Sequence, residues 1–190
     1  MDTIGFYDRD PQGYSDRTFH ADMSHARNRF TSLLPHGARI LDLGCGSGRD
    51  TREFASEGFD VTPVDGSEGM CHVSRKNTGI ETRHMLFSEL DYESCFDGVW
   101  ACSSLLHVPS SELPSILSKV HDALVPHGIF YMTFKKGSFE GERDGRHYTD
   151  MTGDSLVRLI GSTGFETIDI WESLEPGRDV VWVNALVKRS

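Results

Sequence analysis

The residues best suited to chemistry in this chain are two aspartates and three glycines that accompany two short apolar runs. In chain order they are Asp42, Gly44, Gly46, Gly48 and Asp65. Because glycine has no side chain, a ligand can approach the main chain closely where the first run ends. At the end of the second run, the Asp65 carboxylate can accept hydrogen bonds from both hydroxyls of a ribose. This spacing predicts a nucleoside site.

Such a site requires a strand, a glycine turn, a helix and a second strand, joined as a right-handed βαβ unit with both strand ends at one rim. Strand patterns occur at 39–43, 60–64, 82–86, 97–101 and 128–135, and helical patterns at 50–56, 68–76, 111–124 and 152–162. This alternation predicts a parallel sheet with helices on both faces.

Two further strands are expected at 166–171 and 180–187, with a short turn at Pro176 and Gly177 between them. That connection is too short for a parallel crossover, so the two strands must pair antiparallel. The predicted fold is a doubly wound α/β fold, with a mostly parallel seven-stranded sheet and one antiparallel strand near the C-terminus.

Two nucleoside cofactors compete for the glycine turn. Dinucleotide enzymes use G-x-G-x-x-G, because a pyrophosphate needs a helix N-terminus free of acidic groups. Here the glycines are two apart, and Asp42 and Asp50 flank the turn. Negative charge there would repel a pyrophosphate and attract a cationic amine or sulfonium. The pattern therefore favours S-adenosylmethionine.

The stretch 42–48 (DLGCGSG), followed by Val64-Asp65-Gly66-Ser67 and Met70, resembles the first two motifs of class I S-adenosylmethionine-dependent methyltransferases. Segments 96–101 and 124–130 resemble the fourth and fifth strands of that family. The resemblance runs from about Ile40 to the C-terminus. It implies a Rossmann-like methyltransferase fold, S-adenosylmethionine as cofactor and S-adenosylhomocysteine as product.

The resemblance also implies which residues hold the cofactor. Asp65 would bind the ribose, Met70 would lie beside the adenine, and the loop after the third strand would read the adenine amino group. The alternative to the ribose role is that Asp65 only caps a helix. The alternative for Met70 is that it only fills the core. The implied cofactor-binding residues are Asp42, Gly44, Cys45, Gly46, Gly48, Asp65, Gly66, Ser67, Met70, Phe87, Ser88, Glu89, Ala101 and Cys102.

Methyl transfer from a sulfonium mainly needs alignment of the reacting atoms, so a general base is optional. His107 follows the fourth strand. Its ordinary pKa near 6.5 would let it accept a proton from a hydroxyl, amine or thiol, or it holds only the cofactor or its own loop. A helix expected from Asp16 to just before Pro35 covers the cofactor rim or simply packs on the sheet edge. Tyr14, in the segment ahead of this helix, is the expected lid residue and the second expected catalytic residue.

Residues 136–150 form a long polar, glycine-broken segment after the fifth strand, a length typical of a functional loop. It emerges at the rim that holds the cofactor. The expected substrate-binding residues are Arg143, Arg146, His147 and Tyr148, since arginine binds carboxylate and phosphate groups bidentately. The alternative is a solvated run of charges.

The 190 residues, 37% of them hydrophobic, suit a single domain over 1–190, with a cap segment at 1–37 and the core at 38–190. A formal charge of −10 opposes binding to nucleic acid. Four cysteines without short paired spacing indicate neither a disulfide framework nor a metal site. No signal-peptide or membrane-helix pattern is present, so a cytoplasmic location without membrane contact is expected.

The sequence therefore predicts an enzyme that methylates a small polar acceptor. Two alternatives remain open: a methyltransferase acting on a transfer RNA base, and a regulatory protein that binds S-adenosylmethionine without turnover. The acceptor, the methylated atom type and the oligomeric state are left undetermined.

Overall fold

The computed structural model describes residues 3–175 and 179–190, and its main sheet has the strand order β3-β2-β1-β4-β5-β9-β8. These strands are β1 (Arg39–Leu43), β2 (Asp60–Asp65), β3 (Arg83–His84), β4 (Phe96–Ala101), β5 (Leu124–Lys135), β8 (Phe165–Leu174) and β9 (Val181–Arg189). Strands β1 to β5 pair parallel, whereas β9 runs antiparallel to both β5 and β8. The predicted doubly wound fold is confirmed. The expected turn at Pro176 and Gly177 lies outside the described residues.

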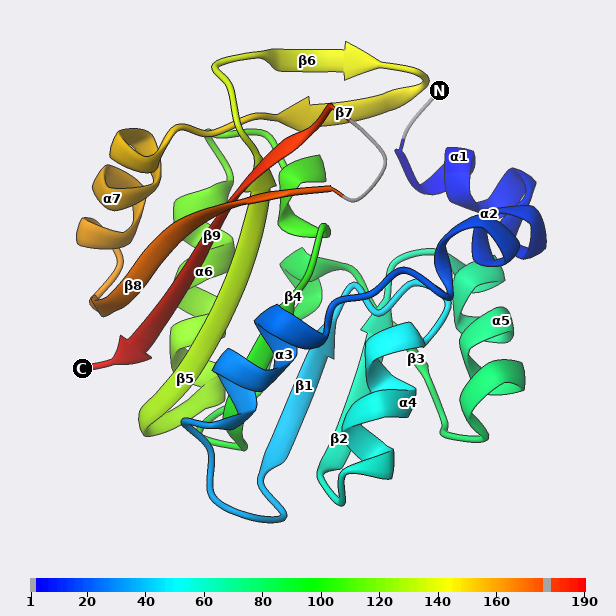
Figure 1. Ribbon diagram of the computed structural model, residues 1–190, viewed down its shortest axis with the longest axis horizontal. Helices are drawn as coiled ribbons and strands as arrows, with labels where there is room; N and C mark the ends of the chain where they lie inside the picture. The colour runs from blue at the N-terminus through cyan, green and yellow to red at the C-terminus, as the bar shows by residue number, and fades with distance from the viewer. Residues whose placement is uncertain (1–2, 176–178) are drawn as a thin grey trace.

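Helices cover both faces of the sheet (Figure 1). They are α3 (Ser24–Thr31), α4 (Arg49–Ser56), α5 (Glu68–Thr78), α6 (Leu113–Ala123) and α7 (Gly153–Gly161). On one face, Phe30 of α3 and Phe54 of α4 pack against Trp100 of β4. On the other face, the apolar stripes of α6 and α7 bury Leu117 and Leu156 completely. The sheet is therefore the middle of three layers.

The strand order reverses between β1 and β4, because the chain builds outward from β1 to β3 and then returns to the other side of β1. In open parallel sheets of this kind, ligands bind at this reversal, outside the carboxyl ends of the strands. The glycine turn leaves β1 at that edge, and the loop containing the short helix η2 (Leu105–His107) leaves β4 there. The topology brings both segments to one crevice.

The N-terminal segment differs from the prediction of one helix between Asp16 and Pro35. It forms α1 (Thr3–Arg9) and α2 (Pro11–Thr18), and only then α3. Asp10 caps the N-terminus of α2, and its side chain accepts a hydrogen bond from the Gly13 amide. Asp22 accepts a hydrogen bond from the Ser24 amide at 2.8 Å, a local bond that competes with helix continuation. The expected helix is thus interrupted between α2 and α3.

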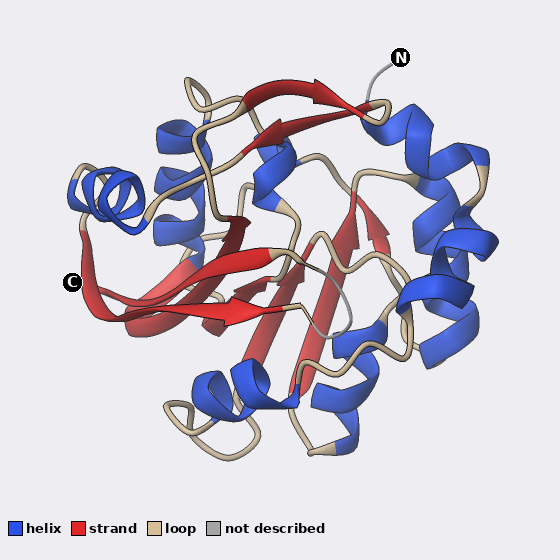
Figure 2. Cartoon of the chain, turned by 45° about the horizontal axis from the view of Figure 1, so that its top comes forward, coloured by secondary structure: helices blue, strands red, loops and turns tan. Residues whose placement is uncertain are grey.

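The segment 136–150 is also more ordered than the predicted loop. It contains a hairpin of β6 (Glu140–Arg143) and β7 (Arg146–Thr149), paired antiparallel. The two residues between the strands, Asp144 and Gly145, have φ of +53° and +76°. An Asp-Gly pair with positive φ at both positions is typical of the tightest hairpin turns. The hairpin extends beyond the sheet and lies next to α1 (Figure 2).

Candidate functional site

The glycine turn after β1 is shaped by close packing against the loop after β4. Gly44 and Gly46 have φ of +76° and +56°, and the Gly44 amide donates to the Val64 carbonyl at 2.9 Å. A Cβ on Gly44 would lie only 2.4 Å from Cβ of Ser104. A Cβ on Gly46 would meet no atom nearer than 3.9 Å. The turn therefore leaves the main chain at Gly46 open to a ligand.

Asp65 joins this turn to the one that follows β2. Its Oδ2 accepts a hydrogen bond from the Gly46 amide and its Oδ1 from the Ser67 amide, both at 2.8 Å. Burial raises the pKa of this carboxyl, and the nearby Asp8 raises it further. Each carboxylate oxygen has two lone pairs, so each keeps one for a further donor. Asp65 thus stands where the ribose hydroxyls are expected, already oriented by two amides.

The two acids at the glycine turn do not carry the free negative charge that the sequence argument assumed. Asp50 accepts hydrogen bonds from Arg27 at 2.9 Å, Arg49 at 2.6 Å and the Trp100 indole at 3.0 Å. Burial opposes ionisation of Asp50, but Arg49, the Trp100 indole and Arg27 together outweigh it and lower the pKa. Asp42 is only 3% exposed and accepts a hydrogen bond from Thr51 at 2.5 Å. Burial, with Asp50 adding to it, raises the pKa of Asp42 to about 7.

The electrostatic reason for preferring a sulfonium is therefore wrong for Asp50, because two arginines neutralise that acid. The structure supports the nucleoside part of the prediction, which S-adenosylmethionine and a dinucleotide have in common. The open main chain at Gly46 and the oriented carboxylate of Asp65 together fit a nucleoside whose ribose meets the end of β2.

His107 meets a tyrosine from the far end of the chain. Its Nδ1 lies 2.7 Å from the His147 carbonyl oxygen, and its Nε2 lies 2.8 Å from the Tyr7 hydroxyl. A carbonyl can only accept, so Nδ1 carries the proton, and Nε2 accepts from Tyr7. Burial lowers the pKa of His107 to about 4 and raises that of Tyr7. The imidazole is neutral at physiological pH and presents a basic nitrogen to the phenol.

Tyr14, the expected partner of His107, contacts Tyr7 and not His107 itself. Its ring meets the edge of the Tyr7 ring at 5.0 Å between centroids. Tyr7 therefore contacts His107, and Tyr14 supports Tyr7. Sequence reasoning missed Tyr7, because 100 residues separate it from its partner and no local pattern connects the two. The aromatic residues near the N-terminus were the only signal available.

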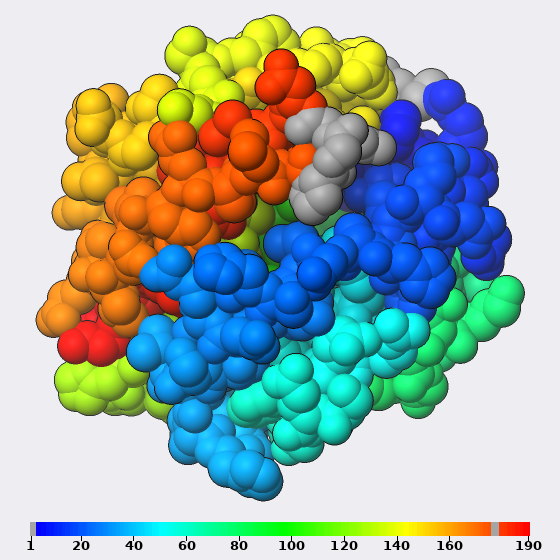
Figure 3. Space-filling model, viewed as in Figure 1, coloured from blue at the N-terminus to red at the C-terminus, as the bar shows by residue number. Residues whose placement is uncertain are grey.

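Helices α1 and α2 pack against α5, and α1 also contacts β7 of the hairpin, so that the blue N-terminal atoms lie between the green atoms of α5 and the yellow atoms of the hairpin (Figure 3). Asp8 accepts hydrogen bonds from the Ser67 hydroxyl at 2.5 Å and the Gly69 amide at 3.0 Å. At the other end of α1, the Thr3 hydroxyl accepts from the His147 amide at 3.0 Å. Within the predicted range, α3 packs on the sheet, as one of the two readings held, whereas the contacts with α5 and the hairpin come from α1 and α2, which lie mostly ahead of that range.

The other expected cofactor residues differ in their surroundings. Met70 is buried under the glycine turn, and Phe87 is half-buried against Gly44. Ser88 and Glu89 are exposed, and Glu89 is already used as an acceptor for the Leu86 amide at 2.8 Å. The structure gathers the remaining members at the carboxyl ends of β1, β2 and β4 and the turns that follow: Asp42, Gly44, Cys45, Gly46, Gly48, Asp65, Gly66, Ser67, Ala101 and Cys102.

Neither cysteine at this rim has the character of a nucleophile. Burial raises the pKa of the Cys45 thiol, and it raises that of Cys102 to about 12. Arg49 donates a hydrogen bond to the Cys102 sulfur at 3.4 Å without offsetting this effect. Both thiols remain protonated near neutral pH, as wall residues of the crevice.

The four expected substrate residues of the hairpin lie around the rings of Tyr148 and His107. Tyr148 is 3% exposed, and its ring lies 4.9 Å from that of His107. Arg143 forms an ion pair with Asp150 at 2.8 Å. Arg146 lies over the Phe6 ring at 4.3 Å, and His147 supplies the carbonyl that orients His107.

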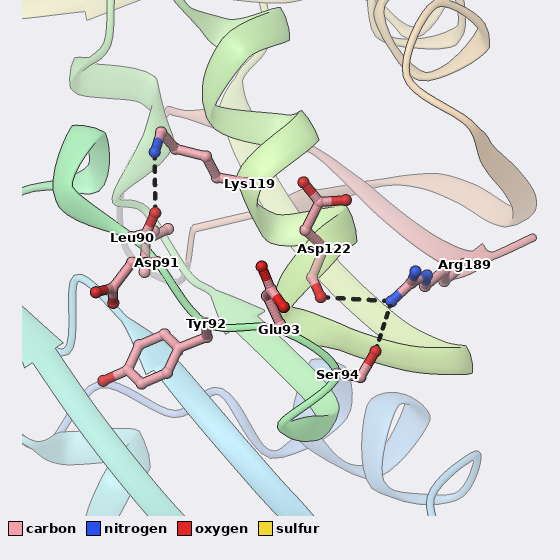
Figure 4. Close-up of a pocket in the computed structure, with 8 residues that line it drawn as sticks. All are labelled: Leu90, Asp91, Tyr92, Glu93, Ser94, Lys119, Asp122 and Arg189. Atoms are coloured by element: carbon pink, nitrogen blue, oxygen red, sulfur yellow. Dashed lines mark hydrogen bonds between the residues drawn. The ribbon is translucent and has the colours of Figure 1, made fainter.

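A separate pocket of about 560 Å³ lies at the opposite edge of the sheet, near the amino end of β4 (Figure 4). Its two basic side chains are already engaged. Lys119 donates to the Leu90 carbonyl at 2.9 Å, and Arg189 donates to Ser94 and to the Asp122 carbonyl. This pocket has no contact with the glycine turn or His107, and it is not the candidate site.

Comparison with known proteins agrees with this architecture. Residues 40–128 match the family model described as a methyltransferase domain. A putative methyltransferase of Bacillus subtilis, YqeM, is 30% identical over 124 residues, which cover 61% of this chain and 50% of that protein. The ubiquinone biosynthesis O-methyltransferase of Rhodopseudomonas palustris is 30% identical over 108 residues, or 54% and 42% of the two chains. The chain thus spans half or less of the length of these curated relatives.

Solved structures show the same fold over nearly the whole chain. One is the 1,6-didemethyltoxoflavin-N1-methyltransferase of Burkholderia thailandensis, crystallised with 1,6-didemethyltoxoflavin and S-adenosylhomocysteine. It has a TM-score of 0.80 at 24% identity, covering 98% of this chain and 85% of that one. An S-adenosylmethionine-dependent methyltransferase from Methanosarcina mazei has a TM-score of 0.76 at 20% identity, covering 89% and 98%. The segment 40–128, which contains both the glycine turn and Asp65, is thus similar to a methyltransferase domain, and the whole chain has the fold of S-adenosylmethionine-dependent methyltransferases.

Proposed function

We propose that this protein transfers the methyl group of S-adenosylmethionine to a small-molecule acceptor and releases S-adenosylhomocysteine. The observation that carries this proposal is the Tyr7–His107 pair, held at 2.8 Å beside the rim where the family binds its cofactor. Two similar proteins support a small acceptor by their names, the ubiquinone enzyme and the toxoflavin enzyme.

The cofactor supplies an electrophilic methyl group on a positively charged sulfur. Asp65 would accept the ribose hydroxyls with the lone pairs that its two amide partners leave free. The open main chain at Gly46 would lie against the nucleoside, and Phe87 would flank the adenine. Helix α1 closes over the turn after β2, since Ile4 would lie 3.4 Å from a Cβ on Gly66. This cover excludes water from the reaction.

The proton of an attacking hydroxyl or amine needs an acceptor, and Tyr7 and His107 provide one. The hydroxyl or amine of the methyl acceptor gives its proton to the Tyr7 oxygen, and at the same time the phenol proton of Tyr7 passes to Nε2 of His107. The His147 carbonyl keeps the other proton on Nδ1, so the imidazole holds the required tautomer. For an attacking hydroxyl, a weak base such as buried His107 is sufficient, because the attacking oxygen becomes strongly acidic once it bonds to the methyl group.

Calorimetry with S-adenosylmethionine is the first test. Asp65→Ala should abolish binding, whereas Asp60→Ala, at the exposed amino end of the same strand, should leave it intact. The second test is S-adenosylhomocysteine release from a small-molecule extract of the source cells. Absence of binding by the unaltered protein would refute the proposal. Binding without release would favour the regulatory alternative, and release only with added transfer RNA would favour the RNA acceptor.

A further inference from the structure

Three cationic side chains gather around one buried tyrosine at the base of the hairpin. Lys135 ends β5, and Arg143 and Arg146 flank the hairpin turn. Their charged groups lie 4.5, 5.1 and 5.2 Å respectively from the centroid of the Tyr148 ring. Three positive charges on a single ring repel one another unless anions accompany them.

The protein supplies only part of that negative charge. Arg143 pairs with Asp150 at 2.8 Å. Among the described residues, no carboxylate lies within ion-pair distance of Lys135 or Arg146, although Asp150 and Glu175 act on Lys135 from farther away. The Nε atom of Arg146 is buried and has no hydrogen-bond partner among residues 3–175 and 179–190. Burial and Arg143 together lower the pKa of Lys135. Within the part of the chain that the structure describes, two positive charges thus have no ion-pair partner, in a chain whose net charge is −10.

These charges lie directly beside the proposed proton acceptor. One terminal nitrogen of Arg146 is 3.5 Å from the Tyr7 hydroxyl. The Tyr148 ring that the cations surround lies 4.9 Å from the His107 ring. A group bound by Lys135 and Arg146 would therefore lie next to Tyr7 and would be separated from His107 by the Tyr148 ring.

We propose that the methyl acceptor is a small organic anion whose carboxylate or phosphate is bound by Lys135 and Arg146, with its nucleophilic hydroxyl or amine directed to Tyr7. The inference rests on the proposed function and narrows it. Arginine matches the two oxygens of either group, and lysine adds a point charge. The neutral His107 leaves these two cations as the charges that select the acceptor. A neutral molecule would leave them unpaired in the closed site.

The experiment measures S-adenosylhomocysteine release from the small-molecule extract before and after passage over an anion exchanger at pH 8. Acceptor activity is expected in the retained fraction. Activity confined to the flow-through would overturn this inference and leave the proposed function standing. An unfractionated extract without activity would overturn the proposed function itself. Alkaline phosphatase should destroy the active compound if it carries a phosphate and spare it if it carries a carboxylate.

Variants then identify the binding groups, with the retained fraction as substrate. Lys135→Met and Arg146→Gln should each raise the KM for this fraction ten-fold or more and change kcat less. Lys136→Met removes the same charge one residue away, where Lys136 pairs with Glu172 at 2.8 Å, and should leave the KM unchanged. Unaltered S-adenosylmethionine affinity would show that each variant is folded, and Arg146→Lys should recover part of the loss. Equal KM values for Lys135→Met and Lys136→Met would overturn the inference.

Discussion

The buried carboxyl group of Asp42 should make this protein less stable at alkaline pH. Asp42 lies in the middle of the sheet at 3% exposure, and its pKa rises from 3.8 to about 7 in the folded chain, mainly through burial. Between these two values the folded protein retains a proton that the unfolded chain has released. The free energy of unfolding therefore falls as the pH rises through this window.

The pKa difference sets the size of the effect. A difference of about 3 pH units at 1.36 kcal/mol each amounts to about 4 kcal/mol once the pH exceeds 7. At pH 5 only the interval above 3.8 contributes, which is about 1.5 kcal/mol. Asn has nearly the same shape as Asp and never ionises. Asp42→Asn should therefore stabilise the folded protein by up to about 4 kcal/mol at pH 8, and by less than half of that at pH 5.

Urea unfolding at pH 5 and pH 8, followed by tryptophan fluorescence, measures both values. Asp97 provides a control of opposite sign, because hydrogen bonds from Arg39 lower its pKa even though burial works against them. Asp97→Asn should destabilise the protein at both pH values. If the advantage of Asp42→Asn is the same at pH 5 and pH 8, or if the variant is less stable at pH 8, the burial argument is wrong.

Two further substitutions test the glycine turn and the proton acceptor. Gly44→Ala should reduce the free energy of unfolding by about 3 kcal/mol or more, because its Cβ would collide with Ser104 at 2.4 Å in a backbone conformation that already disfavours alanine. Gly79→Ala has a similar φ of +72° with open space around it and should cost only about 1 to 2 kcal/mol, so equal losses in urea would contradict the packing argument. Tyr7→Phe should lower kcat by about 100-fold with the S-adenosylmethionine affinity unchanged in calorimetry, since His107 loses its proton donor. An unaltered kcat would exclude Tyr7 from proton transfer.

The sequence was sufficient to predict the elements whose signals are local or periodic. Strand–helix alternation determines the doubly wound sheet, and the glycine spacing with Asp65 at the end of an apolar run predicts a nucleoside site at its carboxyl edge. The short connection before the last strand also determines the antiparallel pairing. These features depend on backbone geometry and side-chain periodicity within one or two elements, so their pattern can be read along the chain.

The tertiary structure alone decided how the site is charged and closed. Arg27 neutralises Asp50 across 23 positions, and Tyr7 reaches His107 across 100. The N-terminal segment divides into two short helices that contact α5 and the hairpin, and a third helix that packs on the sheet, and the polar segment 136–150 contains a hairpin that brings Arg143 and Arg146 next to Tyr148. Hydrogen bonds and ion pairs between distant residues depend on how whole elements dock, and burial then changes each pKa. No local pattern in the sequence carries that information.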